Sequence, residues 1–301
     1  MKKPQLILIG IGVIVLAGLY FLIPESNSKK NKPANTEHSA GDGHNHDEHD
    51  GHDHGTGNHT FNEEVYLSQN ESKLTPERQQ YLAALKESVI RGDVKGQNLH
   101  TFHQLAKFWK DSVPNPFIHF YYTTKAAELE NTEKSLTFAA QSVLKYLPYV
   151  ENGEQQKWLA NSAKSLFDKA LLINAKSDSL IIGSSACLIY GADAGGEGLM
   201  QGIMKIREVA QRDSTNMYAQ YMLGIASMTS GQFDKAIARF ETVAKAQPQN
   251  VELLFKAAES CELARQYDKA IDWYKRIIAL NIDPQMKPEL EKRIKELETK
   301  K

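Results

Sequence analysis

The sequence predicts an all-α fold built as a solenoid of helical hairpins, and three observations lead to that prediction. A short segment occurs twice: residues 232–237 read QFDKAI and residues 266–271 read QYDKAI, 34 positions later. Apolar residues recur at helical spacing through most of the chain after Leu74, with proline, glycine or asparagine between the helical segments. A composition of 41% hydrophobic and 24% charged residues is ordinary for a soluble core. Hairpins that repeat at a fixed period bury their apolar faces by stacking on their neighbours.

The two copies share the residue types that close helix packing requires. Counted from Met217 and Val251, three positions match: Gly224 and Ala258 at the eighth, Ala236 and Ala270 at the twentieth, and Phe240 and Tyr274 at the twenty-fourth. Antiparallel helices approach closely only where small side chains face each other, and the aromatic ring then fills the space beside them. Pro248 is expected to stop the second helix of the first copy.

With these residues, the segment from Met217 to Pro284 resembles the tetratricopeptide repeat family. The resemblance implies a right-handed α-solenoid with repeats over residues 178–216, 217–250 and 251–284. It also implies binding to other proteins, because such repeats serve as binding surfaces far more often than as catalysts.

The N-terminus carries an uncharged apolar run from Leu6 to Ile23, closed by Pro24. Eighteen helical residues span roughly 27 Å, close to the hydrocarbon thickness of a membrane. We therefore expect a signal-anchor transmembrane helix over residues 1–24. The alternative is a removed signal peptide, which requires a shorter apolar run and a small-residue cleavage site that the segment FLIPE at residues 21–25 lacks. Lys2 and Lys3 on a short tail favour a repeat domain that faces the periplasm or cell exterior from the cytoplasmic membrane.

A polar stretch follows the apolar run. From Glu25 to Thr60 the chain contains no Val, Ile, Leu, Met or aromatic residue, so it cannot bury enough apolar surface to offset its conformational entropy. We expect residues 25–73 to form a disordered linker rich in His and Asp.

The polar stretch contains seven of the ten histidines of the chain. Those proposed as metal ligands are His44, His46, His49, His52 and His54, interleaved with carboxylates. Imidazole is a good ligand for Zn, Cu and Ni, but the irregular spacing indicates a loose chelating tract and not a structural zinc site. The alternative is a polar spacer that binds no metal in the cell. No other cofactor is expected.

Residues 74–177 predict degenerate helical hairpins without a clean period of 34. The expected helices run over residues 75–90, 94–111, 117–130, 132–149 and 154–174. The last of them carries Phe167 where the repeats place their aromatic residue. His100 and His103 lie three apart on one helix, which suits a shared metal, but no third ligand is evident.

Two segments depart from the regular repeats. In the repeat 178–216 the turn from Gly191 to Gly198 holds five additional residues, which indicate a flexible insertion; a phosphate-binding loop would need a Gly-Lys-Ser/Thr sequence that is missing. Residues 285–301 predict a capping helix, with Leu290, Ile294 and Leu297 on one face.

Composition and motifs exclude several classes of function. The formal net charge of -1 offers no basic excess for nucleic acid. The motifs of zinc proteases, of serine hydrolases and of phosphate-binding loops do not occur, so the sequence does not predict an enzyme. Cys187 and Cys261 are too few for a disulfide framework and are expected to be buried, free thiols.

The predicted function is a membrane-tethered scaffold that binds a protein or peptide in the concave groove of its repeats. The resemblance places the first helix of each repeat in that groove, and the proposed partner-binding residues are Tyr218, Tyr221, Met228, Phe255, Glu259 and Glu262. Aromatic residues beside glutamates suit an apolar or basic segment. The layout also resembles bacterial envelope assembly factors, including accessory subunits of cytochrome c maturation. The alternative is a metal-handling protein whose histidine tract buffers or delivers Zn, Cu or Ni.

Overall fold

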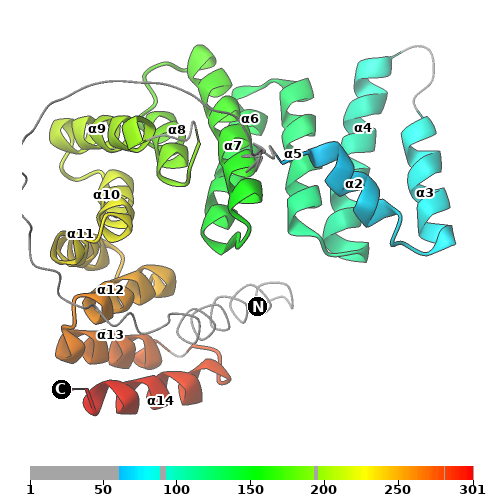
Figure 1. The fold of residues 1–301 in the computed structure, drawn as a ribbon. Helices are drawn as coiled ribbons and strands as arrows, with labels where there is room; N and C mark the ends of the chain where they lie inside the picture. The colour runs from blue at the N-terminus through cyan, green and yellow to red at the C-terminus, as the bar shows by residue number, and fades with distance from the viewer. Residues whose placement is uncertain (1–60, 89–92, 193–195, 281, 301) are drawn as a thin grey trace, which may run out of the picture. The chain divides into compact units, whose positions relative to one another are not determined.

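The computed structural model describes residues 61–88, 93–192, 196–280 and 282–300, and in these ranges every regular element is a helix (Figure 1). These ranges belong to one compact unit, Phe61–Lys301. The all-α prediction is confirmed for them. The expected membrane helix and the histidine tract lie outside the described residues. Within the described ranges, no helix is both long enough and apolar enough to cross a membrane.

The first helices of the unit are held together by aromatic residues. Their bounds are α2 Glu63–Glu71, α3 Pro76–Glu87, α4 Val94–Lys107 with a π-helical turn Phe108–Ser112, and α5 Pro116–Glu130. Asparagine caps start α2 and α5: Asn62 Oδ1 accepts from the backbone N–H of Val65, and Asn115 Oδ1 from that of Ile118. The expected single helix over residues 94–111 thus changes its winding at Phe108.

The ordered structure begins earlier than the sequence predicts. Helix α2 lies inside the stretch 25–73 that was expected to be a linker, and the start proposed near Leu74 is wrong. The rings of Phe61 and Tyr66 lie 5.0 and 5.1 Å from the ring of Phe117, between centroids. The composition argument does not apply beyond Thr60, because the next residues include aromatic side chains that find partners some fifty positions away.

The central helices are α6 Glu133–Tyr146, followed by a 3₁₀ turn Leu147–Tyr149, then α7 Gly153–Ile173, α8 Asp178–Ile189 and α9 Gly196–Arg212. In helix α8 every residue from Ile182 to Ile189 is buried. Helix α9 begins at Gly196, so the last three residues of the expected insertion, Gly196 to Gly198, belong to a helix and not to the turn.

The C-terminal helices are α10 Met217–Thr229, α11 Phe233–Ala246, α12 Val251–Leu263, α13 Tyr267–Ala279 and α14 Met286–Glu298. Helices α10 and α12 begin at the residues from which the two sequence copies were counted. Each is preceded by an asparagine cap, Asn216 or Asn250, whose Oδ1 accepts a backbone N–H three residues on.

Consecutive helices pair as hairpins, and the hairpins follow one another in chain order (Figure 1). The pairs are α4 with α5, α6 with α7, α8 with α9, α10 with α11, and α12 with α13. In α10 a side chain on Gly224 would place its Cβ 2.6 Å from Cε1 of Phe240, so only glycine admits that ring. Gly183 of α8 stands in the same relation to Phe167 of α7, with a distance of 2.5 Å. The small and aromatic positions of the sequence are therefore sites of closest helix approach.

The last helix is fixed by an ion pair as well as by apolar contacts. Leu290, Ile294 and Leu297 of α14 are buried, as the expected capping helix requires. Arg293 of the same helix pairs with the carboxylate of Glu262 on α12, and Tyr274 of α13 donates its hydroxyl to that carboxylate at 2.6 Å. One acidic side chain thus joins three helices.

Candidate partner-binding cavity

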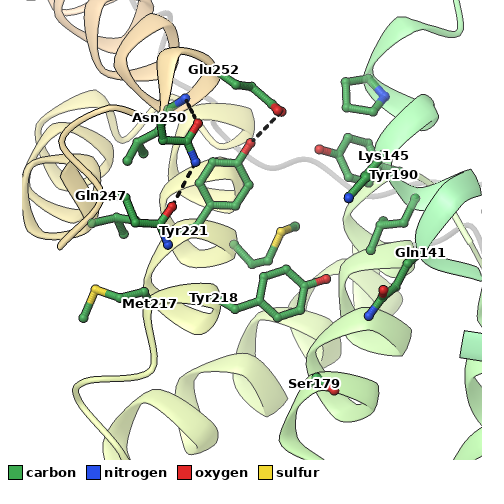
Figure 2. Close-up of a pocket in the computed structure, with 15 residues that line it drawn as sticks. Gln141, Lys145, Ser179, Tyr190, Met217, Tyr218, Tyr221, Gln247, Asn250 and Glu252 are labelled. Atoms are coloured by element: carbon green, nitrogen blue, oxygen red, sulfur yellow. Dashed lines mark hydrogen bonds between the residues drawn. The ribbon is translucent and has the colours of Figure 1, made fainter. Parts of the chain in front are cut away.

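A cavity of about 360 Å³ opens on the face formed by the first helices of four successive hairpins, α6, α8, α10 and α12 (Figure 2). Its lining residues are Gln141, Leu144, Lys145, Pro148, Ser179, Tyr190, Met217, Tyr218, Tyr221, Met222, Val243, Gln247, Asn250, Glu252 and Leu253. Apolar and aromatic side chains dominate, with single charges and amides among them. That composition is typical of sites that bind small molecules or peptide side chains.

Helical geometry explains how each element reaches the cavity. Residues 217, 218, 221 and 222 fall on one face of α10, and residues 141, 144 and 145 on one face of α6. Helix α8 is buried between its neighbours, so only its two ends, Ser179 and Tyr190, reach the cavity. Asn250 and Glu252 stand at the start of α12, where the chain enters from α11.

The three tyrosines that line the cavity are neutral hydrogen-bonding groups. Burial raises the pKa of Tyr190, Tyr218 and Tyr221 well above the ordinary value of a phenol. The carboxylate of Glu252 raises the pKa of Tyr190 and Tyr221 further. Tyr221 donates its hydroxyl to Oε1 of Glu252 at 3.5 Å, as Figure 2 shows.

Two charged side chains stand on opposite walls of the cavity. Lys145 comes from α6 and Glu252 from α12, and both are exposed (Figure 2). Among the described residues neither forms a salt bridge. Farther along α12, Glu259 pairs with Lys256 at 2.8 Å. The cavity therefore offers an unpaired carboxylate and an unpaired ammonium group to whatever enters it.

The structure brings two of the six predicted partner-binding residues into the cavity and places the other four elsewhere. Tyr218 and Tyr221 line it. Phe255 lies 6.2 Å from the ring of Tyr274, between centroids, and Met228 is half-buried against the core. Glu259 pairs with Lys256 on its own helix. Glu262 holds Arg293 of α14, and its side chain is only 14% exposed.

Sequence reasoning missed the half of the cavity that α6 and α8 supply. Gln141, Lys145 and Tyr190 come from a part of the chain without a clean period, so no groove position could be assigned to them. Tyr190 itself is a usable signal. It is the only aromatic residue in α8 and its C-terminal cap, and it lies at the end where the chain leaves this mostly buried helix.

Metal and thiol chemistry find no support in the described ranges. There, no group of three His, Cys, Asp or Glu side chains is arranged to hold a metal ion, and His100 and His103 are exposed. Cys187 and Cys261 are buried and free, as expected. Burial raises the pKa of Cys261 to about 11 and also raises that of Cys187, so neither thiol is an activated nucleophile.

A second cavity of about 250 Å³ lies between α11 and α13 and includes Glu241, Lys245, Trp273 and Arg276 in its lining. There the guanidinium of Arg276 lies over the ring of Trp273, 4.4 Å from its centroid. The chain thus places its own cation on this aromatic face, which leaves less for a partner to bind than the first cavity offers.

The fold and the cavity define a tandem helical-repeat protein, an α-solenoid. Residues 221–285 match the family model of the tetratricopeptide repeat. No curated protein sequence matches the chain.

Several solved structures are similar to the chain at low identity. MamA from Desulfovibrio magneticus RS-1 is 14% identical, with a TM-score of 0.38 over 64% of this chain and 97% of that one. YrrB, described as a TPR protein with an unusual peptide-binding site, is 16% identical, with a TM-score of 0.37 over 71% and 97%. A tetratricopeptide repeat protein from Parabacteroides merdae is 14% identical, with a TM-score of 0.38 over 73% and 88%.

Proposed function

We propose that this protein is a membrane-tethered scaffold that holds a partner protein or peptide in the cavity formed by α6, α8, α10 and α12, and that it serves assembly of an envelope complex. The observation that carries the proposal is the position of the cavity. It opens on the first helices of the hairpins and is lined by the half-buried side chains of Tyr218 and Tyr221, residues that the resemblance to tetratricopeptide repeats assigns to a binding groove.

The chemistry of the lining suits recognition. Neutral phenols, thioethers and amides surround the space, and tyrosine is among the residues that contribute most to binding energy at interfaces. Phenols also offer a large contact area with few rotatable bonds, which limits the entropy lost when a partner docks. These groups bind and orient, and they supply no activated nucleophile.

The tethering part of the proposal rests on the apolar run from Leu6 to Ile23. We expect the full chain to remain in the membrane fraction after washes at high salt and at alkaline pH. Protease added outside the cytoplasmic membrane should cut the chain before Phe61. Release of a shorter soluble chain, or complete protection from the protease, would contradict the anchor or the orientation.

Site-specific photocrosslinking in native membranes tests the cavity. A photoreactive residue at Gln141, inside the cavity, is expected to yield a discrete adduct with a partner. The matched control is the same residue at Met204, which is 52% exposed on α9 and does not line the cavity. Tyr218→Ala together with Tyr221→Ala should remove the Gln141 adduct. An adduct that survives this double substitution would place the partner elsewhere.

The histidine tract supports a second candidate function, the buffering or delivery of Zn, Cu or Ni. With seven imidazoles in a short stretch, we expect binding of several metal ions that weakens between about pH 7 and pH 5 as the imidazoles are protonated. Deletion of residues 38–59 separates the two functions. The Gln141 adduct should persist if the chain is a scaffold, and it should disappear if the tract is needed for partner binding.

A further inference from the structure

We propose that the cavity recognises a cationic side chain, a lysine or arginine of an extended partner segment, held by the rings of Tyr190, Tyr218 and Tyr221 and by the carboxylate of Glu252. This inference rests on the proposed function, because it names the chemistry of the partner at the same site.

Three tyrosine rings from two helices line one space (Figure 2). Tyr190 comes from the end of α8, and Tyr218 and Tyr221 come from the first turns of α10. Aromatic faces carry partial negative charge and attract an ammonium or guanidinium group within about 6 Å of the ring centroid. Such sites bind cations more strongly when the rings are shielded from water, as they are here.

The chain places its own cations over other aromatic faces but not over these three, although the ring of Tyr221 also packs against Phe240 with 5.8 Å between centroids. Arg276 lies over Trp273, and Nζ of Lys125 lies 5.5 Å from the ring centroid of Tyr121. Among the described residues, no lysine or arginine lies over the ring of Tyr190, Tyr218 or Tyr221. The described part of the chain therefore leaves room for the cation of a partner.

Glu252 supplies the charge that complements such a cation. Its carboxylate is exposed, accepts a hydrogen bond from Tyr221 and has no salt-bridge partner within the described ranges. Tyr149 lies beside the cavity. Burial raises the pKa of Tyr149, and the negative charge of Glu252 raises it further. A guanidinium group pairs with a carboxylate through charge-assisted hydrogen bonds and also stacks on aromatic faces.

The rest of the lining suits the aliphatic part of a lysine or arginine. Met217, Met222 and Leu253 offer an apolar wall for the methylene groups, while the charged end reaches polar partners. A volume of about 360 Å³ admits one long side chain and part of the backbone that carries it.

Lys145 is the one feature that could favour an anion instead. It stands on the opposite wall, on α6, and is exposed. Tyr221 donates its hydroxyl to Glu252, and both residues line the cavity together with Tyr190. A cation near Glu252 therefore gains both contacts, whereas an anion at Lys145 would meet the negative faces of the rings.

The test uses the full chain in detergent and an array of capped heptapeptides. Each flanking sequence appears three times, with arginine, its neutral isostere citrulline, or glutamate at the centre. We expect arginine peptides to bind about tenfold more tightly than their citrulline partners, as one hydrogen-bonded charge pair implies. Glu252→Gln should abolish this preference. Lys145→Gln should strengthen arginine binding about twofold by removing a like charge. Glu208→Gln, exposed on α9 outside the cavity, is the control for loss of a carboxylate.

The outcomes separate the inference from the proposed function. If peptides bind in a manner that Tyr221→Ala abolishes, but arginine and citrulline bind alike, the cation site is wrong and the scaffold stands. A preference for glutamate that Lys145→Gln abolishes would also overturn the inference and would make the cavity an anion site. If no peptide depends on Tyr221, both the inference and the assignment of partner binding to this cavity fail.

Discussion

In the hairpin α10–α11, a glycine of one helix faces a phenylalanine of the other, whereas α2, α5 and α7 are held together by rings that contact one another. Phe240 is fully buried against Gly224. In the N-terminal part, Phe117 contacts Phe61 and Tyr66, and it also lies 5.2 Å from Trp158 of α7, between centroids. A glycine also faces a phenylalanine at Gly183 and Phe167, between adjacent hairpins. Ring contacts occur in the repeats too, at Tyr221 and Phe240, but the N-terminal cluster draws on residues far apart in the sequence.

The two arrangements differ in how many side chains share the packing energy of a contact between helices. In a repeated hairpin one ring fills one space, so that removing it leaves a cavity that no neighbour can close. In the ring cluster each member has several partners, and all but Phe117 keep some exposed surface, so that the loss of one outer ring is shared. The repeats should therefore be sensitive at single positions, and the N-terminal helices should tolerate single changes better.

The largest expected effect is the loss of the ring between α10 and α11. Phe240→Ala should lower the free energy of unfolding by about 3–5 kcal/mol. Tyr121 stacks on Trp158 of the N-terminal ring cluster, 5.7 Å between centroids, and Tyr121→Ala should cost about 1–2 kcal/mol because that side chain is only partly buried. Urea unfolding followed by circular dichroism measures both. Phe138→Ala is the control, since this ring is 69% exposed. Equal costs at residues 240 and 121 would remove the contrast between the two regions.

The next effect is the release of the capping helix α14 from α12. Arg293→Ala leaves the nearly buried carboxylate of Glu262 with Tyr274 alone and should cost about 2 kcal/mol. Lys287→Ala breaks an exposed pair with Glu291 on the same helix and should cost less than about 0.5 kcal/mol. Thermal unfolding distinguishes the two. A negligible loss for Arg293→Ala would show that apolar contacts alone hold α14.

A smaller effect should distinguish the steric cost of a side chain at a close helix contact from the gain in helix propensity when glycine is replaced. Gly224→Ala gains propensity but forces the ring of Phe240 to move, so a net loss of about 1 kcal/mol is expected. Gly153→Ala, at the start of α7, has nothing within 4 Å of the added carbon and should stabilise by up to about 1 kcal/mol. Chemical denaturation should therefore show a lower free energy of unfolding for Gly224→Ala and a higher one for Gly153→Ala. Stabilisation by both substitutions would mean that the hairpin can relax around the ring.

The smallest effect is a pH dependence confined to the N-terminal region. His119 donates from Nδ1 to the carbonyl oxygen of Ala106 at 2.8 Å, just before the π-helical turn. Burial lowers the pKa of His119; Lys110 lowers it further, while the bond to Ala106 and the charge of Asp111 oppose the shift. The unfolded imidazole takes up a proton near pH 6.5, and the folded one resists it. The free energy of unfolding therefore falls as pH drops below about 6.5.

His119→Gln keeps a donor for Ala106 and should reduce this pH dependence between pH 7.5 and pH 5.5. His103→Gln is the matched control, because that imidazole is exposed on α4, and it should leave the dependence unchanged. Melting temperatures across the pH range measure the effect. An unchanged slope for His119→Gln would assign the acid sensitivity to carboxylates.

The contrast between packing within one hairpin and contacts between distant residues also decides how much of the fold is predictable from the sequence. The period of 34 and its small and aromatic residues lie within one hairpin, so the repeat pattern alone is enough to pair Gly224 with Phe240. Helix α2 was missed because only Leu67 within it is buried, and because its other anchors pack on residues about fifty positions away. The start of α9 at Gly196 was missed because glycines usually indicate a turn.

The residues of the candidate site were predictable only where they belong to a regular repeat. Tyr218 and Tyr221 follow from their positions in a regular repeat. Lys145 and Tyr190 depend on how α6 and α8 stand relative to α10, which no local pattern records. Glu262 has the spacing of a groove residue, but its role is set by Arg293 on a helix that begins more than twenty residues later. Position within the repeat determines the face of the helix, and tertiary contacts determine what the side chain does there.

The cavity has a mechanical consequence, because its walls come from four successive hairpins. Each hairpin touches mainly its neighbours, so the angle at each junction between hairpins sets the width of the space they enclose. A segment lodged between α6 and α12 would act as a strut across three such junctions and stiffen that stretch of the coil. Tension along the chain would widen the gap and loosen the segment, so the grip of the protein on its partner would depend on load.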